Sequence, residues 1–527
     1  MEKVQLYDTT LRDGAQTSGI SFSVNDKIRI VRQLDALGVD YIEGGWPSAN
    51  PRDVAFFEGM RSVSLRHAKL AAFGSTCRKH TPANEDTQLQ QLLAYDVPVV
   101  TIYGKSWDLH VTESLRVTLE ENLRMIEESI AFLRSGGVET FFDAEHFFDG
   151  YLGNPEYALE TLRAAERGGA QGIILCDTNG GCLPDQLRAA MRAVRNAVST
   201  PLGIHTHNDS DLAVANSLLA VEEGARQVQG TINGYGERCG NANLCSIIPT
   251  LELKMGFVGL PPGQLSALYS TAHFVAEVAN MNPPEHQPYV GISAFAHKAG
   301  MHIDSVTKLK RSYEHIVPEE VGNTTSMLIS DQAGGSAIVT RAGRLGIELD
   351  KKSPVTREIV EKLKKAEHEG YEFEAAEASF ELLVRRTLQQ FTPVFNVISF
   401  RVIIGGDSSG LLPLSEAIVR VNIGDQVELT VADGDGPVNA LDGALRKALE
   451  PHFPRLAEIR LVDFKVRVVN LRAGTAARVR VLVESTDTQG NSWSTVGVHE
   501  NIIQASLEAL CDALHYGLHM AVKQPVH

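Results

Sequence analysis

The sequence predicts an α/β fold: a (β/α)8 TIM barrel, followed by a helical subdomain and a C-terminal α+β domain built from a βββα repeat. Three observations predict it. Eight short apolar runs alternate with amphipathic segments in the first half of the 527 residues. Polar residues gather at the carboxyl ends of these runs, and the last part of the chain repeats one strand and helix pattern. We expect domains at 1–275, 276–390 and 391–527.

The apolar runs are the expected strands of the barrel, since eight strands in about 250 residues is what such a barrel requires. They span residues 4–7, 39–43, 69–73, 97–103, 138–143, 172–176, 202–207 and 228–233. The segments 25–37, 118–133 and 184–197 are amphipathic and predict helices between strands. An open sheet of fewer strands is the alternative, but no glycine-rich dinucleotide turn follows the first run, which disfavours it.

Ionisable and amide side chains lie at or just past the carboxyl ends of these strands. They are Asp8, Glu43, Asp143, Glu145, Asp177, His205, His207 and Asn233. A (β/α)8 barrel places its chemistry at this end. Burying so many polar groups unpaired would cost several kcal/mol each, so their gathering predicts a ligand site at the barrel mouth.

The chain after the barrel changes character. The sequence 281–284 contains two prolines and marks a break, and the region that follows is rich in helix formers and charge. The last domain repeats three strands and a helix: first at 397–404, 417–423, 427–431 and after Pro437, then at 461–469, 478–484, 493–498 and from Asn501. Such a pair has no barrel mouth, and we expect it to serve binding and dimer contacts rather than catalysis.

Composition excludes several classes of function. The chain has 49 Lys and Arg against 65 Asp and Glu, a net charge of −16, which disfavours a nucleic acid or an anionic membrane as partner. No run approaches the roughly 18 apolar residues of a membrane span, and the first residues do not resemble a signal peptide. The six cysteines lack paired metal spacing, so we expect reduced thiols and a cytoplasmic location.

The pair His205 and His207 predicts a metal site. Side chains alternate along a strand, so both imidazoles face the same way with Cα atoms about 7 Å apart. Asp13, just after the first strand, is a suitable third ligand, and Asn241 offers a neutral oxygen. This mixed donor set suits Zn²⁺, Mn²⁺ or Mg²⁺. The alternatives are a hydrogen-bonded core histidine pair, a capping role for Asp13 and a turn role for Asn241.

Three further charged residues belong to the same mouth. Arg12 is adjacent to Asp13, where a guanidinium stabilises developing enolate or alkoxide charge. Glu43 and Glu145 end the second and fifth strands, where either can orient Arg12, position water or transfer a proton. A structural pairing with that arginine is the alternative for both carboxylates.

Several motifs resemble one enzyme family. DTTLRDG at 8–14, HTHND at 205–209 and GYGERCGNAN at 234–243 are similar to motifs of the 2-isopropylmalate synthase, homocitrate synthase and citramalate synthase family. The resemblance extends to 294–302, 433–438 and 493–497, and so covers essentially the whole chain. It implies an acyltransferase that condenses the enolate of acetyl-CoA with a 2-oxo acid on a divalent metal and then hydrolyses the thioester.

The resemblance also implies roles for single residues. Asp13, His205 and His207 match the metal ligands, with Asn241 at or near the ion. Arg12 matches the arginine that stabilises the enolate and binds the oxo acid, and Glu43 matches the glutamate that supports this arginine. Glu145 and Thr178 match groups around the oxo acid. His302 matches the base, with Tyr313 as its neighbour. The terminal domain resembles the regulatory domain of the family. The family is dimeric, and its subdomain reaches over the partner's barrel.

The acceptor is predicted from the stretch EGGWPSANP at 43–51, which resembles citramalate synthases more than isopropylmalate synthases. Trp46, helped by Tyr103, would shrink the pocket until pyruvate fits and 2-oxoisovalerate does not. We therefore expect (R)-citramalate synthesis on the route to isoleucine, with isoleucine as a feedback effector. The alternatives are a 2-isopropylmalate synthase, a 3-hydroxy acyl-CoA lyase on the same barrel, and a non-catalytic amino-acid sensor.

Overall fold

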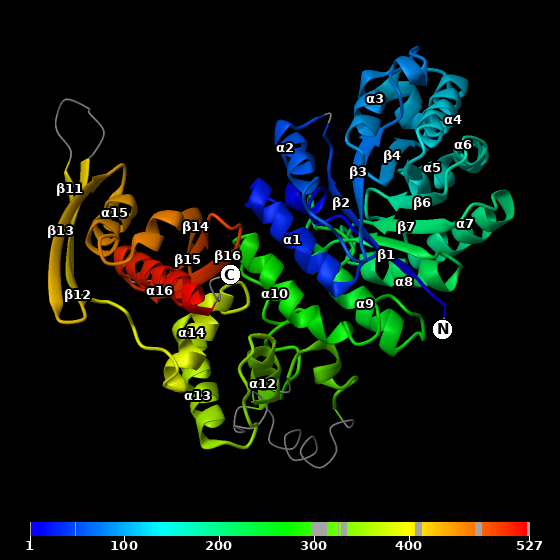
Figure 1. Ribbon diagram of the computed structural model, residues 1–527. Helices are drawn as coiled ribbons and strands as arrows, with labels where there is room; N and C mark the ends of the chain where they lie inside the picture. The colour runs from blue at the N-terminus through cyan, green and yellow to red at the C-terminus, as the bar shows by residue number, and fades with distance from the viewer. Residues whose placement is uncertain are drawn as a thin grey trace. The chain divides into compact units, whose positions relative to one another are not determined.

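The computed structural model describes residues 2–47, 49–297, 313–324, 326–327, 335–405, 414–469 and 477–523 (Figure 1). The chain divides into two compact units, Met1–Ile329 and Ser330–His527. The first unit contains the predicted barrel, and the second contains the predicted βββα repeat. The limits of the helical subdomain at 276–390 stay a prediction.

The first unit is a closed barrel of parallel strands in chain order, as predicted. Its strands are β1 Gln5–Asp8, β2 Tyr41–Gly45, β3 Lys69–Ser75, β4 Val99–Lys105, β5 Glu139–Glu145, β6 Gly172–Asp177, β7 Leu202–Thr206 and β8 Gln227–Gly230. The barrel closes where β1 pairs with both β2 and β8. All carboxyl ends therefore open at one mouth, where Asp8, Glu145 and Asp177 are the last residues of their strands.

The eighth strand is shorter than the predicted run 228–233. It ends at Gly230, and Asn233 lies in a turn with φ 63°, a left-handed conformation that asparagine tolerates. Asn233 Nδ2 donates to the carbonyl oxygen of Ala272 at 2.8 Å. Asn233 therefore anchors the loop after β8 rather than extending the strand.

Helices cover the outside of the barrel (Figure 1). They are α1 Val24–Leu37, α2 Pro51–Met60, α3 Thr87–Ala94, α4 Leu119–Ser135, α5 Phe147–Gly153, α6 Pro155–Arg167, α7 Pro184–Ala197, α8 Ala213–Glu222, α9 Leu244–Leu253 and α10 Leu268–Val278. Sequence chemistry sets their ends: Ser23 and Asp26 form a capping box at the start of α1, and Gly38, at φ 94°, ends it. The three helices predicted at 25–37, 118–133 and 184–197 are confirmed within two residues at each end.

Two cores support the mouth. The larger lies between the strands and the surrounding helices. The smaller fills the barrel itself, with Tyr7, Tyr41, Val99, Phe141 and Ile174 among its members. Tyr7 donates its hydroxyl proton to Glu43 Oε2 at 2.8 Å, so the barrel filling touches the polar layer directly above it. The residues of the mouth are therefore supported from below by the packed interior of the barrel.

The second unit begins with α12 Gly335–Arg344, α13 Pro354–Glu369 and α14 Glu377–Thr387. The repeat follows: β11 Asn396–Gly405, β12 Leu414–Ile423, β13 Gln426–Gly434 and α15 Pro437–Leu449, then β14 Arg460–Val468, β15 Val479–Thr486, β16 Ser492–His499 and α16 Ile502–Lys523. Each half forms a three-stranded antiparallel sheet. The predicted repeat is therefore confirmed strand by strand.

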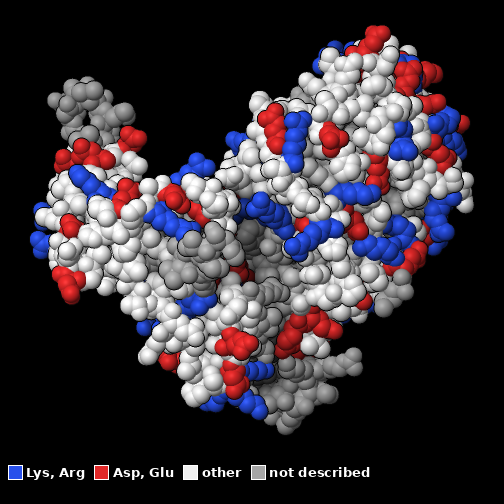
Figure 2. Space-filling model, in the orientation of Figure 1, with Lys and Arg blue, Asp and Glu red and all other residues white. Residues whose placement is uncertain are grey.

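The described helices include none that is both long and apolar enough to cross a bilayer. On the face shown in Figure 2, basic and acidic side chains lie intermixed over the surface.

Candidate metal centre and active site

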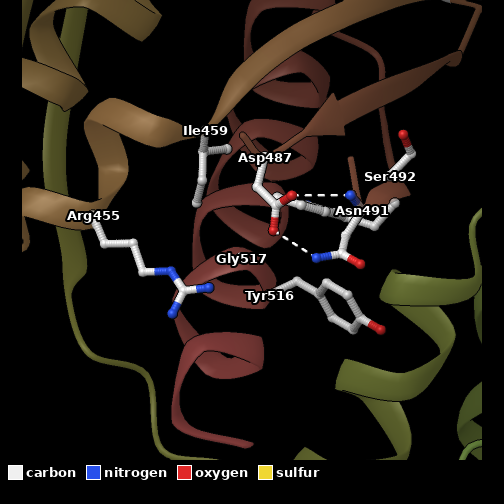
Figure 3. A pocket seen from close by; sticks show the side chains of 8 residues that line it. Arg455, Ile459, Asp487, Asn491, Ser492, Tyr516 and Gly517 are labelled. Carbon is white, nitrogen blue, oxygen red and sulfur yellow. Dashed lines mark hydrogen bonds between the residues drawn. The ribbon is translucent and has the colours of Figure 1, made fainter. Parts of the chain in front are cut away.

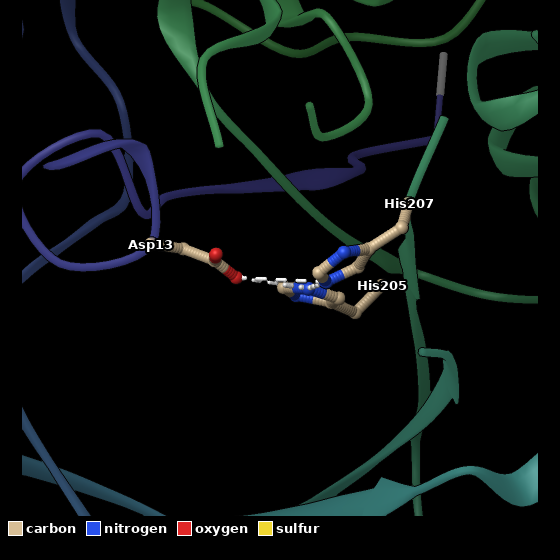
Figure 4. A group of neighbouring side chains, drawn as sticks. All are labelled: Asp13, His205 and His207. Atoms are coloured by element: carbon tan, nitrogen blue, oxygen red, sulfur yellow. Dashed lines mark hydrogen bonds and ion pairs between the residues drawn. The ribbon is translucent and has the colours of Figure 1, made fainter. Parts of the chain in front are cut away.

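Three predicted metal ligands converge at the mouth of the barrel. Asp13 follows β1, His205 lies in β7 and His207 directly after it. Asp13 Oδ2 lies 3.3 Å from His205 Nε2 and 3.7 Å from His207 Nε2. The two Nε2 atoms lie 3.1 Å apart, and the three side chains point at one another (Figure 4). Their ligand atoms all lie within 4.8 Å of one another, close enough to bind a single ion.

The local structure disfavours the alternative role of Asp13. Asp13 precedes the short 3-10 turn Gly14–Gln16, but its side chain makes no capping hydrogen bond there. All three ligands are buried, with exposed fractions of 3%, 4% and 7% in chain order. Buried polar groups need partners, and a carboxylate with two imidazoles is a donor set for a divalent cation.

Gln229 fixes the orientation of His205, a role that the sequence analysis missed. His205 pairs with Gln229 in the register of β7 against β8. His205 Nδ1 lies 2.8 Å from Gln229 Oε1, and Gln229 Nε2 donates to Asp143 Oδ1 at 3.1 Å. Because an amide oxygen only accepts hydrogen bonds, Nδ1 carries the proton and the Nε2 lone pair faces Asp13. This is the arrangement that metal-binding histidines need.

Asn241 supports a metal at this place. Its Nδ2 donates to the carbonyl oxygen of Tyr235 at 3.1 Å, while its Oδ1 is buried with no hydrogen-bond partner among the described residues. Its backbone forms a bridge with that of His207. Gly236 permits this packing, since a Cβ there would lie 2.2 Å from Asn241 Nδ2. An orphaned carbonyl oxygen beside the ligand trio is what a bound cation would satisfy, so the residues fit a divalent metal.

Arg12 lies next to the trio. Its Nη1 lies 3.5 Å from Asp13 Oδ2, and its Nε donates to Glu43 Oε1. Its guanidinium stacks on Phe73, with Cζ 3.8 Å from the ring centroid. Glu43 is fully buried and also accepts from Tyr7. Glu43 and Phe73 therefore hold the Arg12 guanidinium at the mouth. Its remaining N–H groups can bind a ligand.

Burial and charge shift the pKa values of this layer. Burial opposes ionisation of Asp13, but the charges of Arg12 and His205 outweigh it and hold its pKa far below the usual range. Burial and the neighbouring His205 lower the pKa of His207 to about 4. Burial raises the pKa of Asp143 to about 7. A cluster of carboxylates and imidazoles whose pKa values are shifted far from their ordinary values is typical of an active site.

Glu145 and Thr178 lie on neighbouring loops of the same mouth. Glu145, the last residue of β5, forms an ion pair with Lys105 at the end of β4. Thr178 follows β6, and its hydroxyl accepts the backbone N–H of His146 at 2.9 Å. Their roles around the substrate stay predictions. Lys105, another residue that the sequence analysis missed, neutralises Glu145.

An aromatic wall formed by Trp46, Phe73 and Tyr103 stands beside Arg12. Trp46 packs edge-on against both Phe73 and Tyr103, with ring centroids 5.8 Å apart in each case. Phe73 and Tyr103 stack at 5.6 Å. The Trp46 indole N–H donates to Gln88 Oε1 at 3.2 Å. The structure thus joins the two residues predicted to limit the acceptor and adds Phe73 between them and Arg12.

The predicted base, His302, lies outside the described residues. Tyr313 is described, with 48% of its surface exposed, in the segment 313–324. Their roles therefore stay predictions.

Comparison with known proteins places the chain in a family. The HMGL-like family model matches residues 3–275, the homocitrate synthase post-HMGL domain-like model 289–370, and the LeuA allosteric (dimerisation) domain model 374–518. The (R)-citramalate synthases of Geobacter sulfurreducens and Aquifex aeolicus are each 54% identical over 98% of this chain and 98% of their own. A probable 2-isopropylmalate synthase of Methanopyrus kandleri is 31% identical over 96% of this chain and 97% of its own.

The matches agree with the geometry. The HMGL-like match spans every strand of the barrel and all the ligands of the candidate metal centre, and the LeuA domain match spans the βββα repeat. Identity to the (R)-citramalate synthases exceeds identity to the 2-isopropylmalate synthase over almost equal lengths. The chain is an acyl-CoA condensing enzyme that belongs to the HMGL-like family, among its (R)-citramalate synthases.

Proposed function

We propose that the chain condenses acetyl-CoA with pyruvate and hydrolyses the thioester, releasing (R)-citramalate and CoA for isoleucine biosynthesis. The observation that carries this proposal is the convergence of Asp13, His205 and His207 beside Arg12, in a chain 54% identical to (R)-citramalate synthases over almost its full length. A single mouth thus offers an ion site and a guanidinium for the two oxygen atoms that gain charge during condensation.

Asp13, His205 and His207 would hold a divalent metal, Mn²⁺, Zn²⁺ or Mg²⁺, with Asn241 Oδ1 as a further oxygen. When bound, the metal supplies polarisation of the acceptor's keto group. Gln229 keeps His205 Nε2 directed at the ion. The donor set fits each of the three metals, and metal analysis of the purified protein identifies which one it carries.

Arg12 stabilises negative charge on the enolate oxygen of acetyl-CoA and binds the oxo acid. Glu43, fixed by Tyr7, holds the guanidinium in place so that no reorganisation is needed when charge develops. His302 removes the methyl proton, and Tyr313 assists it. A His302→Asn variant tests this role: it should bind metal with unchanged stoichiometry yet lose condensation, whereas retained turnover would remove His302 from the mechanism.

The aromatic wall selects the acceptor by size. Trp46, Phe73 and Tyr103 are packed ring to ring beside Arg12, so extra methyl groups on the acceptor would force these rings apart. Rejection of one extra methylene is worth about 1–3 kcal/mol in a packed pocket. Pyruvate should therefore be preferred to 2-oxobutyrate, and 2-oxobutyrate to 2-oxoisovalerate.

A panel of 2-oxo acids tests the proposal. Thiol release is measured with acetyl-CoA and pyruvate, 2-oxobutyrate, 2-oxoisovalerate or 2-oxoglutarate, and the product acid is identified by mass spectrometry. The highest kcat/KM is expected with pyruvate, with a loss of about tenfold or more for each added methylene. Preference for 2-oxoisovalerate would instead identify a 2-isopropylmalate synthase. Cleavage of a 3-hydroxy-3-methyl acyl-CoA without condensation would identify a lyase.

The chain forms a homodimer through the open face of the first terminal sheet. On that sheet α15 covers the face with Ala417, Val419 and Val421, which are fully buried. The opposite face presents Val427, Leu429 and Val431 with 57%, 58% and 45% of their surfaces exposed. An exposed apolar strip of this kind marks a protein contact, and the matched domain is described as a dimerisation domain.

Sedimentation of wild type and a Leu429→Glu variant tests this face. The variant should shift from dimer to monomer, because a carboxylate would be buried without a partner. Asn196→Glu, an exposed position in α7 on the outside of the barrel, serves as a charge control. We propose that the two protomers of the dimer also exchange subdomains. The monomeric variant should therefore lose turnover as well.

The effector site lies in a cavity of about 190 Å³ in the second unit (Figure 3). Arg455 and Asp487 offer opposite charges, and Ile459, Trp493 and Tyr516 line it with apolar surface. Asp487 accepts the backbone and side-chain N–H groups of Asn491, both at 2.9 Å. A zwitterion with an apolar side chain, such as isoleucine, fits this chemistry. Arg455→Leu should abolish inhibition by isoleucine without lowering uninhibited turnover, and unaltered inhibition would exclude the cavity.

The enzyme works in the cytoplasm. All six cysteines are free thiols, which suits a reducing compartment. Its two small substrates reach the barrel mouth from solution, and neither a nucleic acid nor a membrane is required as a partner.

A further inference from the structure

A second group of titratable side chains lies on the loops after β4 and β5, and the roles above leave it unused. We call Trp107, His110, His146 and Asp149 the His146 cluster. The rings of His110 and His146 meet edge to face with centroids 4.4 Å apart. Trp107 stacks on His110 at 4.8 Å. The family models and relatives assign no role to these residues.

His146 and Asp149 form a carboxylate–imidazole pair. Asp149 Oδ2 lies 3.0 Å from His146 Nδ1. The same oxygen accepts the Asn179 Nδ2–H at 3.0 Å. A carboxylate accepts hydrogen bonds, so His146 Nδ1 is the donor of this pair, and the lone pair of the neutral imidazole lies on Nε2. This is how a carboxylate prepares a histidine to accept a proton.

The backbone of His146 is held in an uncommon conformation. Its φ is 56°, in the left-handed region, at the residue before α5. Its side chain makes no capping hydrogen bond, so helix capping does not explain the residue. Gly150 lets α5 press on the loop after β4, since a Cβ there would meet the carbonyl oxygen of Ser106 at 2.2 Å. A left-handed backbone conformation at a residue other than glycine, fixed by close packing, is typical of a functional position.

The cluster shares the mouth with the metal centre. Thr178 Oγ1 accepts the backbone N–H of His146 at 2.9 Å, and the Thr178 carbonyl oxygen accepts Arg238 Nη2 at 2.8 Å. Arg238 Nη2 in turn lies 3.0 Å from His207 Nδ1. Two residues therefore connect His146 to a metal ligand. Asn179 is exposed, so water reaches the pair from outside the barrel.

We infer that His146 is the general base for hydrolysis of the condensed thioester, with Asp149 as its positioning residue. The inference rests on the proposed function. His146 Nε2 takes a proton from water, the water oxygen bonds to the thioester carbonyl carbon, and the carbon–sulfur bond breaks. The imidazolium returns its proton to the departing thiolate, so one water yields one acid and one thiol.

The reaction has two steps with different needs, and the mouth offers two separate sets of groups. Condensation needs charge stabilisation at carbonyl oxygens, which Arg12 supplies. Hydrolysis needs water, activated by a base that lies close to the solvent-exposed rim. His146 is 9% exposed and its partner Asp149 lies at the rim, with 29% of its side chain exposed. This location suits a base that must meet water after the new carbon–carbon bond has formed.

The test separates condensation from hydrolysis in the full-length, metal-loaded protein. Variants are His146→Asn, since asparagine tolerates φ 56°, and Asp149→Asn. The control is His67→Gln, an exposed histidine before β3 at the opposite end of the barrel. Acetyl-CoA and pyruvate are mixed with excess enzyme, the reaction is quenched, and the condensed thioester and the free acid are both quantified by mass spectrometry.

His146→Asn should condense at a rate within about threefold of the control but hydrolyse about 100-fold more slowly, so that the condensed thioester accumulates. Asp149→Asn should show the same pattern with a loss of about tenfold. Loss of condensation and hydrolysis together, or of neither, overturns the inference. If the wild type does not use pyruvate, the proposed acceptor is wrong, and the same thioester-to-acid ratio is measured with the acceptor that the panel identifies.

Discussion

The barrel mouth and the terminal repeat use buried polar groups in opposite ways. Between the repeat and α14 they satisfy one another: Ser379 donates to Asp512 Oδ2 at 3.2 Å and accepts the Val496 N–H at 3.0 Å, and Tyr516 donates to Glu381 at 2.9 Å. At the mouth, two imidazole Nε2 atoms face each other at 3.1 Å. The side chains of the mouth thus satisfy one another less well than those of the repeat, and a cation would bind between them.

The difference separates residues that stabilise the fold from those that bind a ligand. A polar group whose partner is another side chain adds to the stability of the fold. A buried polar atom without a hydrogen-bond partner among the described residues, such as Asn241 Oδ1, lowers the stability of the fold unless a ligand binds it. We therefore expect changes at the mouth to alter metal binding and turnover, and changes in the repeat to alter unfolding.

The largest effect is expected from Asp13→Asn. The change removes the only anion of the ligand trio, so turnover should fall by about 1000-fold or more and the bound metal should be lost. Steady-state kinetics and elemental analysis of the purified variant measure both. Asp512→Asn, a change to an acid of the repeat, should keep its metal. An Asp13→Asn variant that keeps metal and turnover would contradict the distinction between the two regions.

Leu445→Ala should have the reverse pattern. Leu445 is fully buried in α15, and removing its side chain leaves a cavity that costs about 3 kcal/mol of unfolding free energy. Urea unfolding followed by far-UV circular dichroism measures the loss. Metal content should be unchanged below the unfolding transition. Lost metal without lost stability would show that the regions are not separable in this way.

Gln229→Leu tests the support behind the metal ligands. Without the amide acceptor, His205 can adopt the other tautomer, so metal affinity should fall by about 10–100-fold. Competition with a chromogenic chelator measures it. Gln227→Leu is the matched control, because Gln227 lies on the same strand at its opposite end. Equal losses in both variants would mean that strand packing, rather than the His205 contact, explains the effect.

The smallest effect is a pH dependence in the repeat. His515 stacks on Phe395 at 4.1 Å and donates from Nε2 to its carbonyl oxygen, and burial, with the charge of Arg386, lowers its pKa to about 4. Between about pH 6.5 and 4 the unfolded chain binds more protons at this site than the folded one, so stability falls as pH falls. The loss from this histidine should reach about 1.4 kcal/mol at pH 5.5.

The measurement compares wild type with His515→Gln, which keeps a donor for the carbonyl oxygen but does not titrate. Other groups in this unit, such as Asp512 with its pKa raised by burial, titrate in the opposite sense and cancel in the difference. Fluorescence of Trp493 reports unfolding when Trp46 and Trp107 are replaced by phenylalanine, since the chain has 3 tryptophans. A difference that does not change between pH 7.5 and 5.5 would contradict the assigned pKa.

The sequence predicted the barrel and the repeat because both depend on local periodicity. All eight strands lie where apolar runs occur, and α7, Pro184–Ala197, has the predicted bounds. The His205 and His207 pair was predictable for the same reason, since their spacing of two along a strand fixes a common face. The end of β8 was missed because it depends on the left-handed turn at Asn233, which no periodicity indicates.

The supporting residues of the site were not predictable because they depend on contacts between distant segments. Gln229 meets His205 only through the register of β7 against β8. Phe73 looked like an ordinary strand residue, yet it lies under Arg12 and contacts both other rings of the aromatic wall. One signal was present for Gln229: it is a polar residue inside an apolar run, where a buried amide needs a partner.

One measurement tests the central claim most directly: thiol release from acetyl-CoA and pyruvate before chelation, after exhaustive chelation and after restoring a divalent metal. Turnover should disappear with the metal and return when Mn²⁺, Mg²⁺ or Zn²⁺ is added, saturating at a single ion for each chain. Full turnover in protein that elemental analysis shows to be free of metal would contradict the assignment of Asp13, His205 and His207 as the ligands on which the chemistry depends.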